Sequence, residues 1–179
     1  MVRKLEKKEL EKALFAQFHR RQVVTKCRRK TDTGWVILDD PFVDDWTEEE
    51  YLLLVQCLRN TLDTGGVVFG DFEDGVLKGF ASVEGSFSGS RGQYLELTCI
   101  HVSEEYRGRG TGRKLMVSAK QWARDAGAEK LYISAHSAVE SQAFYDAMGC
   151  REAEEYNALC VEKEPCDCQL ECALTDLTK

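Results

Sequence analysis

A glycine-rich loop is the stretch of this sequence whose residue types and spacing point most clearly to chemistry. Its six residues, 107–112, read Arg-Gly-Arg-Gly-Thr-Gly. Three alternating glycines remove the Cβ atoms that would keep the phosphates of a ligand away from the backbone. A helix that begins at this loop would add unpaired N–H groups and the positive end of its dipole. The loop therefore predicts a binding site for a pyrophosphate.

The elements on both sides of the loop supply this geometry. The run from Tyr94 to Val102 is rich in apolar and β-branched residues and is bounded by turn-forming residues, which predicts a central strand. From Arg113 to Ala126 the apolar residues recur at helical spacing, and Gly127 follows as a stop signal, which predicts an amphipathic helix. A strand, a glycine loop and a helix thus follow one another.

Two common phosphate-binding motifs fit this loop poorly. The dinucleotide fingerprint requires G-x-G-x-x-G, whereas Gly108, Gly110 and Gly112 form G-x-G-x-G. A P-loop requires a Gly-Lys-Ser/Thr ending, whereas Gly112 is followed by Arg-Lys-Leu. Neither of these nucleotide-binding folds is favoured.

The loop resembles the coenzyme A loop of the GNAT superfamily of N-acetyltransferases. That pattern is Gln/Arg-x-x-Gly-x-Gly/Ala, following a strand that ends in an aliphatic residue, any residue and valine. Arg107, Gly110 and Gly112 match the loop, and Ile100-His101-Val102 matches the strand end. The resemblance implies a mixed α/β fold with a central, mostly antiparallel twisted sheet flanked by helices.

The same resemblance implies acetyl-coenzyme A as co-substrate and names the residues that bind it. The backbone of Ile100, His101 and Val102 would pair with the pantetheine arm. The pyrophosphate would be bound by the loop residues Arg107, Gly108, Arg109, Gly110, Thr111 and Gly112. Many relatives carry a cofactor-binding asparagine seven residues before a tyrosine, where this chain has Ala138. His136, Ser137 and Ser141 are the candidate substitutes.

A second similarity lies in the run 144–149, Phe-Tyr-Asp-Ala-Met-Gly. It resembles the Phe-Tyr-x-x-x-Gly-Phe segment of the superfamily, in which the tyrosine hydroxyl protonates the departing thiolate of coenzyme A. The resemblance assigns this role to Tyr145. The alternative is an ordinary core aromatic residue beside Phe144.

Amine acetylation also needs a base that removes a proton from the ammonium group of the acceptor. Glu96 shares a strand face with Thr98 and Ile100, and some members of the superfamily carry a catalytic glutamate in this region. Burial would raise the pKa of Glu96 toward the useful range. A chain of water molecules is the alternative base. His101 alternates onto the other strand face and is favoured as a core histidine.

Length and charge limit the other functions of the chain. With 179 residues, 43% of them hydrophobic, the chain is long enough for one well-buried hydrophobic core and too short for two domains that each have one. We expect an N-terminal helix in residues 1–21 and a single N-acetyltransferase domain in 22–179. No apolar run spans a bilayer and the N-terminus is charged, which predicts a cytoplasmic protein without membrane contact. The net charge of −7 disfavours nucleic acid and suits a cationic small-molecule amine.

The eight cysteines suggest neither a disulfide framework nor a metal site. No C-x-x-C pair occurs, and Cys166, Cys168, Leu170, Cys172 and Leu174 share one face of a period-2 pattern. We therefore expect small core residues of a strand and no bound metal.

The remaining elements follow from periodicity and turn signals. Thr47 and Glu50 form a capping box ahead of a helix that ends near Thr61. The other expected elements are a helix over 4–18, a hairpin within 22–42, a hairpin over 67–84, a strand over 130–134, a helix over 139–148, and strands near 153–161 and 167–174.

The expected function is acetyl transfer from acetyl-coenzyme A to a primary amine of a small molecule. A protein or peptide N-acetyltransferase and a noncatalytic acetyl-coenzyme A sensor are the alternatives. The acceptor pocket is expected to be built from the connection 85–92, the segment before the helix that begins at Thr47, and the final strands. Trp35, Trp46 and Phe87 are candidate lining residues. The N-terminal helix and the final strands could mediate a homodimer.

Overall fold

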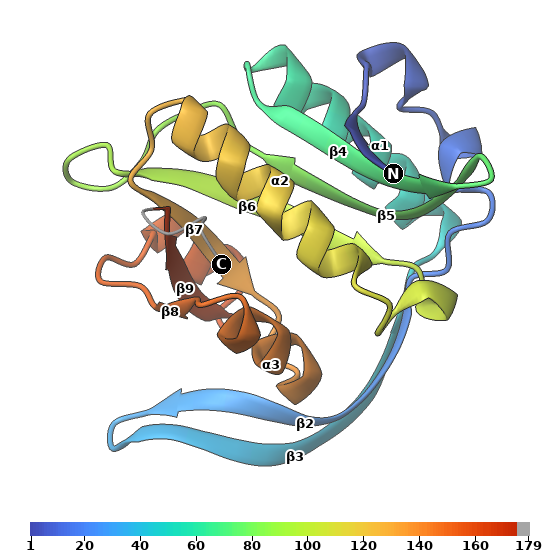
Figure 1. Cartoon of the computed structure of the whole chain (residues 1–179). Coiled ribbons are helices and arrows are strands. Elements are labelled where there is room, and N and C mark those ends of the chain that lie inside the picture. The colour runs from blue at the N-terminus through green and yellow to red at the C-terminus, as the bar shows by residue number, and fades with distance from the viewer. Residues whose placement is uncertain (175–179) are drawn as a thin grey trace.

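A seven-stranded sheet forms the centre of the protein, and the computed structural model describes it within residues 1–174 (Figure 1). The strand order is β1-β4-β5-β6-β7-β9-β8, and every neighbouring pair is antiparallel except β6 and β7. The strands are β1 (Val2–Lys4), β4 (Val67–Glu73), β5 (Val76–Val83), β6 (Tyr94–Val102), β7 (Lys130–Ala135), β8 (Arg151–Glu152) and β9 (Cys168–Ala173). The predicted mixed α/β fold with a mostly antiparallel sheet is confirmed.

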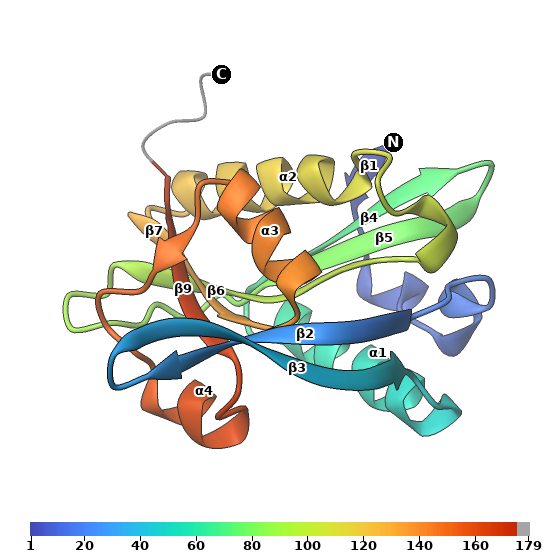
Figure 2. The same ribbon diagram turned by 90° about the horizontal axis from the view of Figure 1, so that it is seen from below.

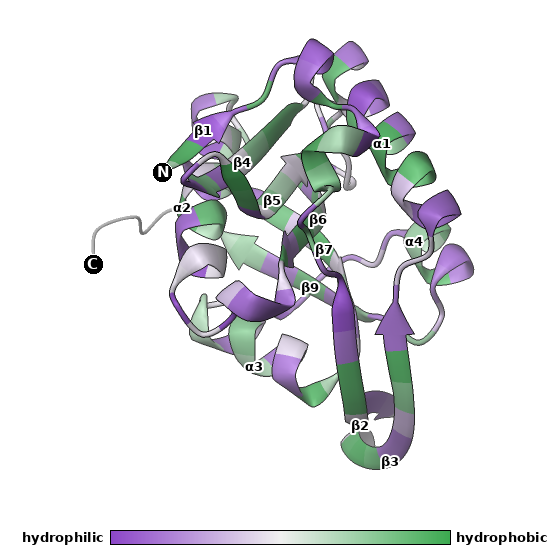
Figure 3. Cartoon of the chain, turned by 90° about the vertical axis from the view of Figure 1, so that its right-hand side faces the viewer, coloured by the Kyte–Doolittle hydropathy of each residue, from purple (hydrophilic) through white to green (hydrophobic). Residues whose placement is uncertain are grey.

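Helices cover both faces of this sheet (Figure 2). Helices α2 (Thr111–Asp125) and α3 (Val139–Ala147) lie on one face, and α1 (Glu48–Asp63) and α4 (Ala158–Lys163) lie on the other. The strands between them are mostly apolar (Figure 3). Leu115, Met116 and Ala119 of α2 are fully buried, because the apolar stripe of this helix faces the sheet.

The predicted capping box of α1 is confirmed. The Thr47 hydroxyl accepts a hydrogen bond from the Glu50 N–H, and the Glu50 carboxylate accepts one from the Thr47 N–H. The helix then runs two residues beyond the predicted end, to Asp63. Leu54, Val55 and Leu58 bury their side chains against the sheet.

A long hairpin, β2 (Arg21–Thr31) with β3 (Gly34–Asp45), extends along the side of the molecule that carries α3 (Figures 1 and 3). Its turn lies at 31–34, as the sequence predicts, although both strands are longer than expected. The backbone of β2 meets the start of α3, where the Arg28 N–H donates to the Ser137 carbonyl at 2.8 Å. The hairpin therefore packs against α3 at one edge.

The helix predicted over residues 4–18 is wrong. This segment forms β1, which pairs with β4, followed by two 3₁₀ helices, η1 (Lys7–Glu9) and η2 (Lys12–Phe15). Leu5, Leu10, Phe15 and Phe18 are buried in the same cluster as α1. Tertiary burial of these side chains outweighs the local helical preference of the surrounding Glu and Lys residues.

The strand predicted near 153–161 is also wrong. The structure has the two-residue strand β8 and then helix α4, which begins after Asn157. The Asn157 side chain accepts a hydrogen bond from the Leu159 N–H, as an N-cap residue does. A strand was expected within the sheet here, but α4 lies against one face of the sheet instead.

No helix in the described part of the chain is long and apolar enough to cross a membrane.

Candidate active site

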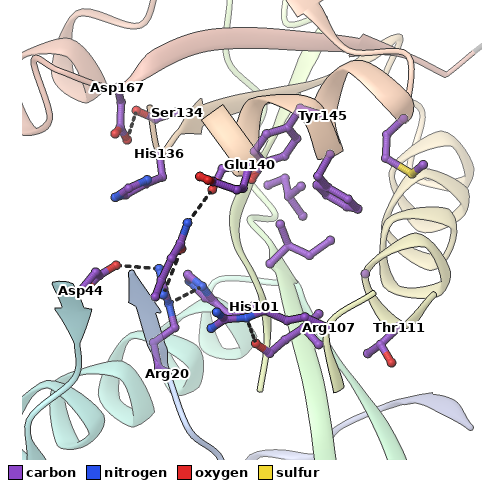
Figure 4. Close-up of a pocket in the computed structure, with 18 of the residues that line it drawn as sticks. Arg20, Asp44, His101, Arg107, Thr111, Ser134, His136, Glu140, Tyr145 and Asp167 are labelled. Carbon is purple, nitrogen blue, oxygen red and sulfur yellow. Dashed lines mark hydrogen bonds and ion pairs between the residues drawn. The ribbon is translucent and has the colours of Figure 1, made fainter. Parts of the chain in front are cut away.

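A cleft opens where β6 and β7 separate. These strands pair over three residues only, from Tyr94 opposite Lys130 to Glu96 opposite Tyr132. Beyond Glu96 the strands diverge, and a cavity of about 1000 Å³ lies between their C-terminal ends and the start of α2. The cleft is therefore a local break in the sheet, with residues from both halves of the chain on its walls (Figure 4).

In the described part of the chain, the edge of β6 that faces this cleft pairs with no strand beyond Glu96. The Ser103 N–H donates to the Lys78 carbonyl of β5 at 2.9 Å, and Ile100 and Val102 lie opposite Ala81 and Gly79. Because successive backbone groups point to opposite edges of a strand, the groups of Ile100 and Val102 point away from β5. Their edge faces the gap, where an extended ligand could pair with it. The backbone groups of His101, which was also predicted to pair with the pantetheine arm, face β5 instead.

The glycine loop lies at one end of the cleft. Gly110 is the N-cap of α2 in the left-handed region, with φ of 83°, and Gly108 has φ of 73°. A Cβ atom on either glycine would point into open space. Within residues 1–174, the N–H groups of Gly108, Arg109 and Gly110 donate no hydrogen bond to a backbone carbonyl. Free amides at a helix N-terminus fit a pyrophosphate.

Gly112 has a different role from the other two loop glycines. A Cβ atom at Gly112 would lie 3.1 Å from the Phe144 ring, so glycine allows α2 and α3 to approach closely across the cleft. Thr111 lines the same end of the cleft and is buried. Helix α3 is thereby held against the loop.

Two arginines of the predicted loop differ in placement. Arg107 lines the cleft, and its Nε donates to the Val102 carbonyl at 3.1 Å. Burial lowers the pKa of Arg107, and the positive charge of Arg20 lowers it further. The Arg109 guanidinium instead lies 5.6 Å from the centre of the Tyr106 ring. Arg107 therefore joins the loop to the strand end.

Tyr145 projects from α3 into the cleft (Figure 4). Its side chain is buried, and burial raises the pKa of the hydroxyl well above its ordinary value of 10. The hydroxyl therefore keeps its proton at neutral pH. A protonated hydroxyl in the cleft is suited to giving that proton to a leaving group.

Glu96 lies at the point where the strands separate. Burial raises the pKa of its carboxyl group from 4.5, a hydrogen bond from Cys160 opposes this rise, and the charge of Glu84 adds to it. The Cys160 thiol of α4 is 3.5 Å from Glu96 Oε1. Within residues 1–174 Glu96 forms no ion pair. This carboxylate can accept a proton from a group in the cleft.

The three candidate substitutes for the missing asparagine are used differently. The Ser137 hydroxyl accepts a hydrogen bond from Arg29, and Ala138 is fully buried against Cys27 of the hairpin. His136 and Ser141 both line the cleft, and the Ser141 hydroxyl is 3.5 Å from Gln22 Nε2. Of the three candidates, His136 and Ser141 therefore lie at the cleft, whereas Ser137 is bound to the hairpin.

Only part of the predicted acceptor wall lies at the cleft. Residues 85–92 do not line the cleft, and neither does Trp35, whose indole N–H donates to Glu152 at 3.0 Å. The wall comes instead from the base of the hairpin, from α4 and from the start of β9. Its residues include Arg20, Gln22, Asp44, Trp46, Cys160, Lys163, Glu164 and Asp167. Asp44, Trp46 and Asp167 lie in segments that the sequence predicts for this wall, whereas Arg20 and the residues of α4 were missed, because the hairpin and α4 could not be placed in space.

Arg20, a residue of this wall, is buried although its sequence context is basic and polar. Arg20 belongs to a basic run that resembles a solvated strand edge. The structure buries its side chain in the cleft, where Nη2 donates to Asp44 at 2.7 Å. The buried arginine and its paired aspartate are separated by 24 residues, so local spacing carries no signal for them.

All eight cysteines are free thiols.

The fold and the cleft agree with the family comparison. A family model described as "Acetyltransferase (GNAT) family" matches residues 32–150, which is most of the chain. The protein therefore belongs to the GNAT family of acetyltransferases and is an acetyl-coenzyme A dependent acyltransferase. The predicted N-acetyltransferase class is confirmed. No curated protein matches the sequence significantly.

Solved structures of other acetyltransferases share the fold at low sequence identity. Nourseothricin acetyltransferase has a TM-score of 0.66 and 20% identity, with 96% of this chain and 95% of that chain covered. A Bacillus anthracis str. Ames protein assigned as a streptothricin acetyltransferase, solved with acetyl-coenzyme A, has a TM-score of 0.70, 16% identity and the same coverage. PaiA N-acetyltransferase from Thermoplasma acidophilum, solved with coenzyme A, has a TM-score of 0.58, 14% identity, and 97% and 98% coverage.

Proposed function

We propose that this protein transfers the acetyl group of acetyl-coenzyme A directly to a primary amine of a small molecule. The observation that carries the proposal is the opening between β6 and β7, where a free strand edge, the glycine loop and Tyr145 meet. When bound, acetyl-coenzyme A supplies the activated acyl thioester. The chain supplies binding, orientation and proton transfer.

Three groups of the chain hold the cofactor in this proposal. The N–H groups of the loop and the first turn of α2 bind the pyrophosphate, assisted by the helix dipole. The free edge of β6 at Ile100 and Val102 aligns the pantetheine arm by backbone hydrogen bonds. Ser141 contributes a hydroxyl from α3. These contacts fix the reacting carbon relative to Glu96 and Tyr145.

Proton transfer is divided between two residues on different walls. Glu96 removes a proton from the ammonium group of the acceptor, so that the amine can attack. Tyr145 gives its proton to the thiolate that leaves, and burial keeps that proton available. The N–H groups on the β6 edge polarise the acyl carbonyl, as fixed donors at a developing oxyanion do.

A small cationic acceptor fits the wall opposite the loop. The base of the hairpin and α4 enclose this part of the cleft. Its acidic side chains, Asp44, Glu96, Glu164 and Asp167, outnumber its basic ones, Arg20 and Lys163. Such a lining attracts cations. Two of the structural neighbours are, by name, acetyltransferases of nourseothricin and streptothricin. A compact amine is therefore the first acceptor class to test.

The test measures release of free thiol from acetyl-coenzyme A with a panel of small amines, amino acids and peptides. Calorimetry of acetyl-coenzyme A alone runs beside it. We expect cofactor binding and turnover with at least one small amine. Turnover with peptides only would replace the proposed acceptor class. Binding without turnover on any acceptor would favour an acetyl-coenzyme A sensor, and no binding would remove the proposed cofactor site.

A further inference from the structure

Arg20 is a charged side chain held rigidly inside the cleft. Only 5% of the surface of Arg20 is exposed to solvent. Nη2 donates to Asp44 at 2.7 Å, Nη1 donates to Gln22 at 3.3 Å, and the guanidinium lies 5.4 Å from the centre of the Trp46 ring. Its backbone N–H also donates to the Tyr51 hydroxyl at 3.1 Å. An arginine with this many contacts occupies one defined position.

The remaining contact of Arg20 is to His101 of β6 (Figure 4). Nε of Arg20 donates to Nδ1 of His101 at 3.1 Å. A guanidinium can only donate hydrogen bonds, so Nδ1 must supply its lone pair. The neutral ring therefore carries its proton on Nε2.

The surroundings keep this ring neutral. Burial lowers the pKa of His101 well below 6.5, and the neighbouring Arg20 and Arg107 act in the same direction. Asp44, a carboxylate close to this group, is paired with Arg20. The lone pair of the ring is also occupied by Arg20. His101 is therefore not suited to act as a base.

The Nε2–H group of His101 is left without a protein acceptor. Within residues 1–174 the ring forms only the bond to Arg20, and it packs against Trp46 and Phe80. His101 lines the cleft, and its Nε2 atom is not sealed off from solvent. A neutral N–H donor is thus presented to the cleft beside the strand edge.

We infer that His101 donates a hydrogen bond to the acceptor molecule, and that Arg20 is the positioning residue that holds His101 in this state. The inference rests on the proposed function. An ammonium group cannot accept a hydrogen bond, so the acceptor must carry an oxygen close to its reacting amine. The chemical class is an amino alcohol, amino amide or amino acid derivative. A simple alkylamine lacks the required group.

The tautomer can be tested without turnover. In protein labelled with ¹⁵N-histidine, His101 should show a protonated Nε2 and an unprotonated Nδ1 at neutral pH. In Arg20→Met the pKa of the ring should rise, because the Arg20 charge that lowers it is removed. A wild-type ring with its proton on Nδ1, or one protonated on both nitrogens at neutral pH, would overturn the inference. His101→Gln identifies the resonance.

Kinetics test the role of the donor, with pairs of acceptors that differ only by one hydroxyl or carbonyl group. His101→Leu should reduce kcat/KM about tenfold for the oxygen-bearing acceptor and leave the KM for acetyl-coenzyme A unchanged. His101→Gln, whose amide N–H can replace Nε2–H, should recover part of the loss. An unchanged acceptor preference in His101→Leu would contradict the inference.

A matched control separates positioning from general damage to the hairpin. Arg29 also pairs with an aspartate of β3, Asp40 at 2.6 Å, but it does not contact His101. Arg29→Met should leave acceptor preference and the state of His101 unchanged, whereas Arg20→Met should alter both. If the wild-type protein acetylates no amine, the proposed function fails, and the tautomer measurement still decides the Arg20–His101 pair.

Discussion

Two residues on opposite walls of the cleft have pKa values that burial moves in the same direction, with different chemical results. Burial raises the pKa of Tyr145, which leaves its hydroxyl protonated and able to donate. Burial also raises the pKa of Glu96 from 4.5, which makes the carboxylate a stronger base once it is ionised. One side chain is thereby suited to give a proton and the other to receive one.

Tyr145→Phe removes the proposed donor while keeping the ring that packs in the cleft. We expect kcat to fall about 100-fold, because general acid catalysis typically contributes on this scale. The dissociation constant of acetyl-coenzyme A should change little. Thiol-release kinetics and calorimetry measure the two quantities. A variant with wild-type kcat would remove Tyr145 from proton transfer.

Glu96→Gln removes the proposed base with little change in shape. In the wild-type enzyme the rate should rise with pH as Glu96 loses its proton, and this rise should lie above pH 4.5 because the pKa of Glu96 is raised. The variant should lack that rise and have a lower kcat. The measurement is a profile of kcat/KM against pH. An identical profile in the variant would favour a chain of water molecules as the base.

At the scale of elements, the glycines at the two ends of α2 allow the effect of backbone strain to be separated from the effect on cofactor binding. Gly110 and Gly127 both have positive φ, 83° and 98°, and open space where a Cβ would lie. Gly110→Ala and Gly127→Ala should each lower the free energy of unfolding by about 1 kcal/mol. Only Gly110→Ala should weaken acetyl-coenzyme A binding, because Gly127 follows the far end of α2. Chemical denaturation and calorimetry compare them, and equal cofactor affinity in both variants would exclude a role for Gly110.

Local signals in the sequence were sufficient for several elements of the fold. The capping box at Thr47, the Asp74-Gly75 turn and the glycine loop each depend on neighbouring residues, and the structure has all three. The helix predicted over 4–18 was wrong because pairing with β4 and tertiary burial decide that segment. The strand predicted near 153–161 was wrong because the local N-cap at Asn157 was missed. The sequence yields the loop and Tyr145 but not Arg20, whose burial, like the structure of 4–18, depends on distant residues.

At the scale of the whole molecule, a buried glutamate joins four elements. Glu171 of β9 accepts hydrogen bonds from the Tyr94 hydroxyl at 2.6 Å, from Lys130 at 2.9 Å and from Arg151 at 2.9 Å. Burial alone would raise the pKa of Glu171, but these hydrogen bonds outweigh it and lower the pKa to about 2. The ionised carboxylate therefore stabilises the folded state.

Glu171→Gln should lower the free energy of unfolding by about 3 kcal/mol at neutral pH, as expected when one partner of a buried ion pair is removed. The folded pKa lies below the ordinary value of 4.5, so the wild-type advantage is present above pH 4.5 and is lost as the pH falls toward 2. Urea titrations at several pH values measure this. A stability difference that does not shrink in acid would contradict the assigned ionisation.

The separation of β6 from β7 also makes a prediction about the rates at which backbone hydrogens exchange with deuterated water. The N–H groups of His101 and Ser103 face β5 and should exchange slowly in the free protein. Those of Ile100 and Val102 face the gap and should exchange fast. On addition of acetyl-coenzyme A, slow exchange should extend to Ile100 and Val102, so that alternate residues of one strand report separately on the fold and on the ligand. Fast exchange that persists at saturating cofactor would show that this strand edge does not bind it.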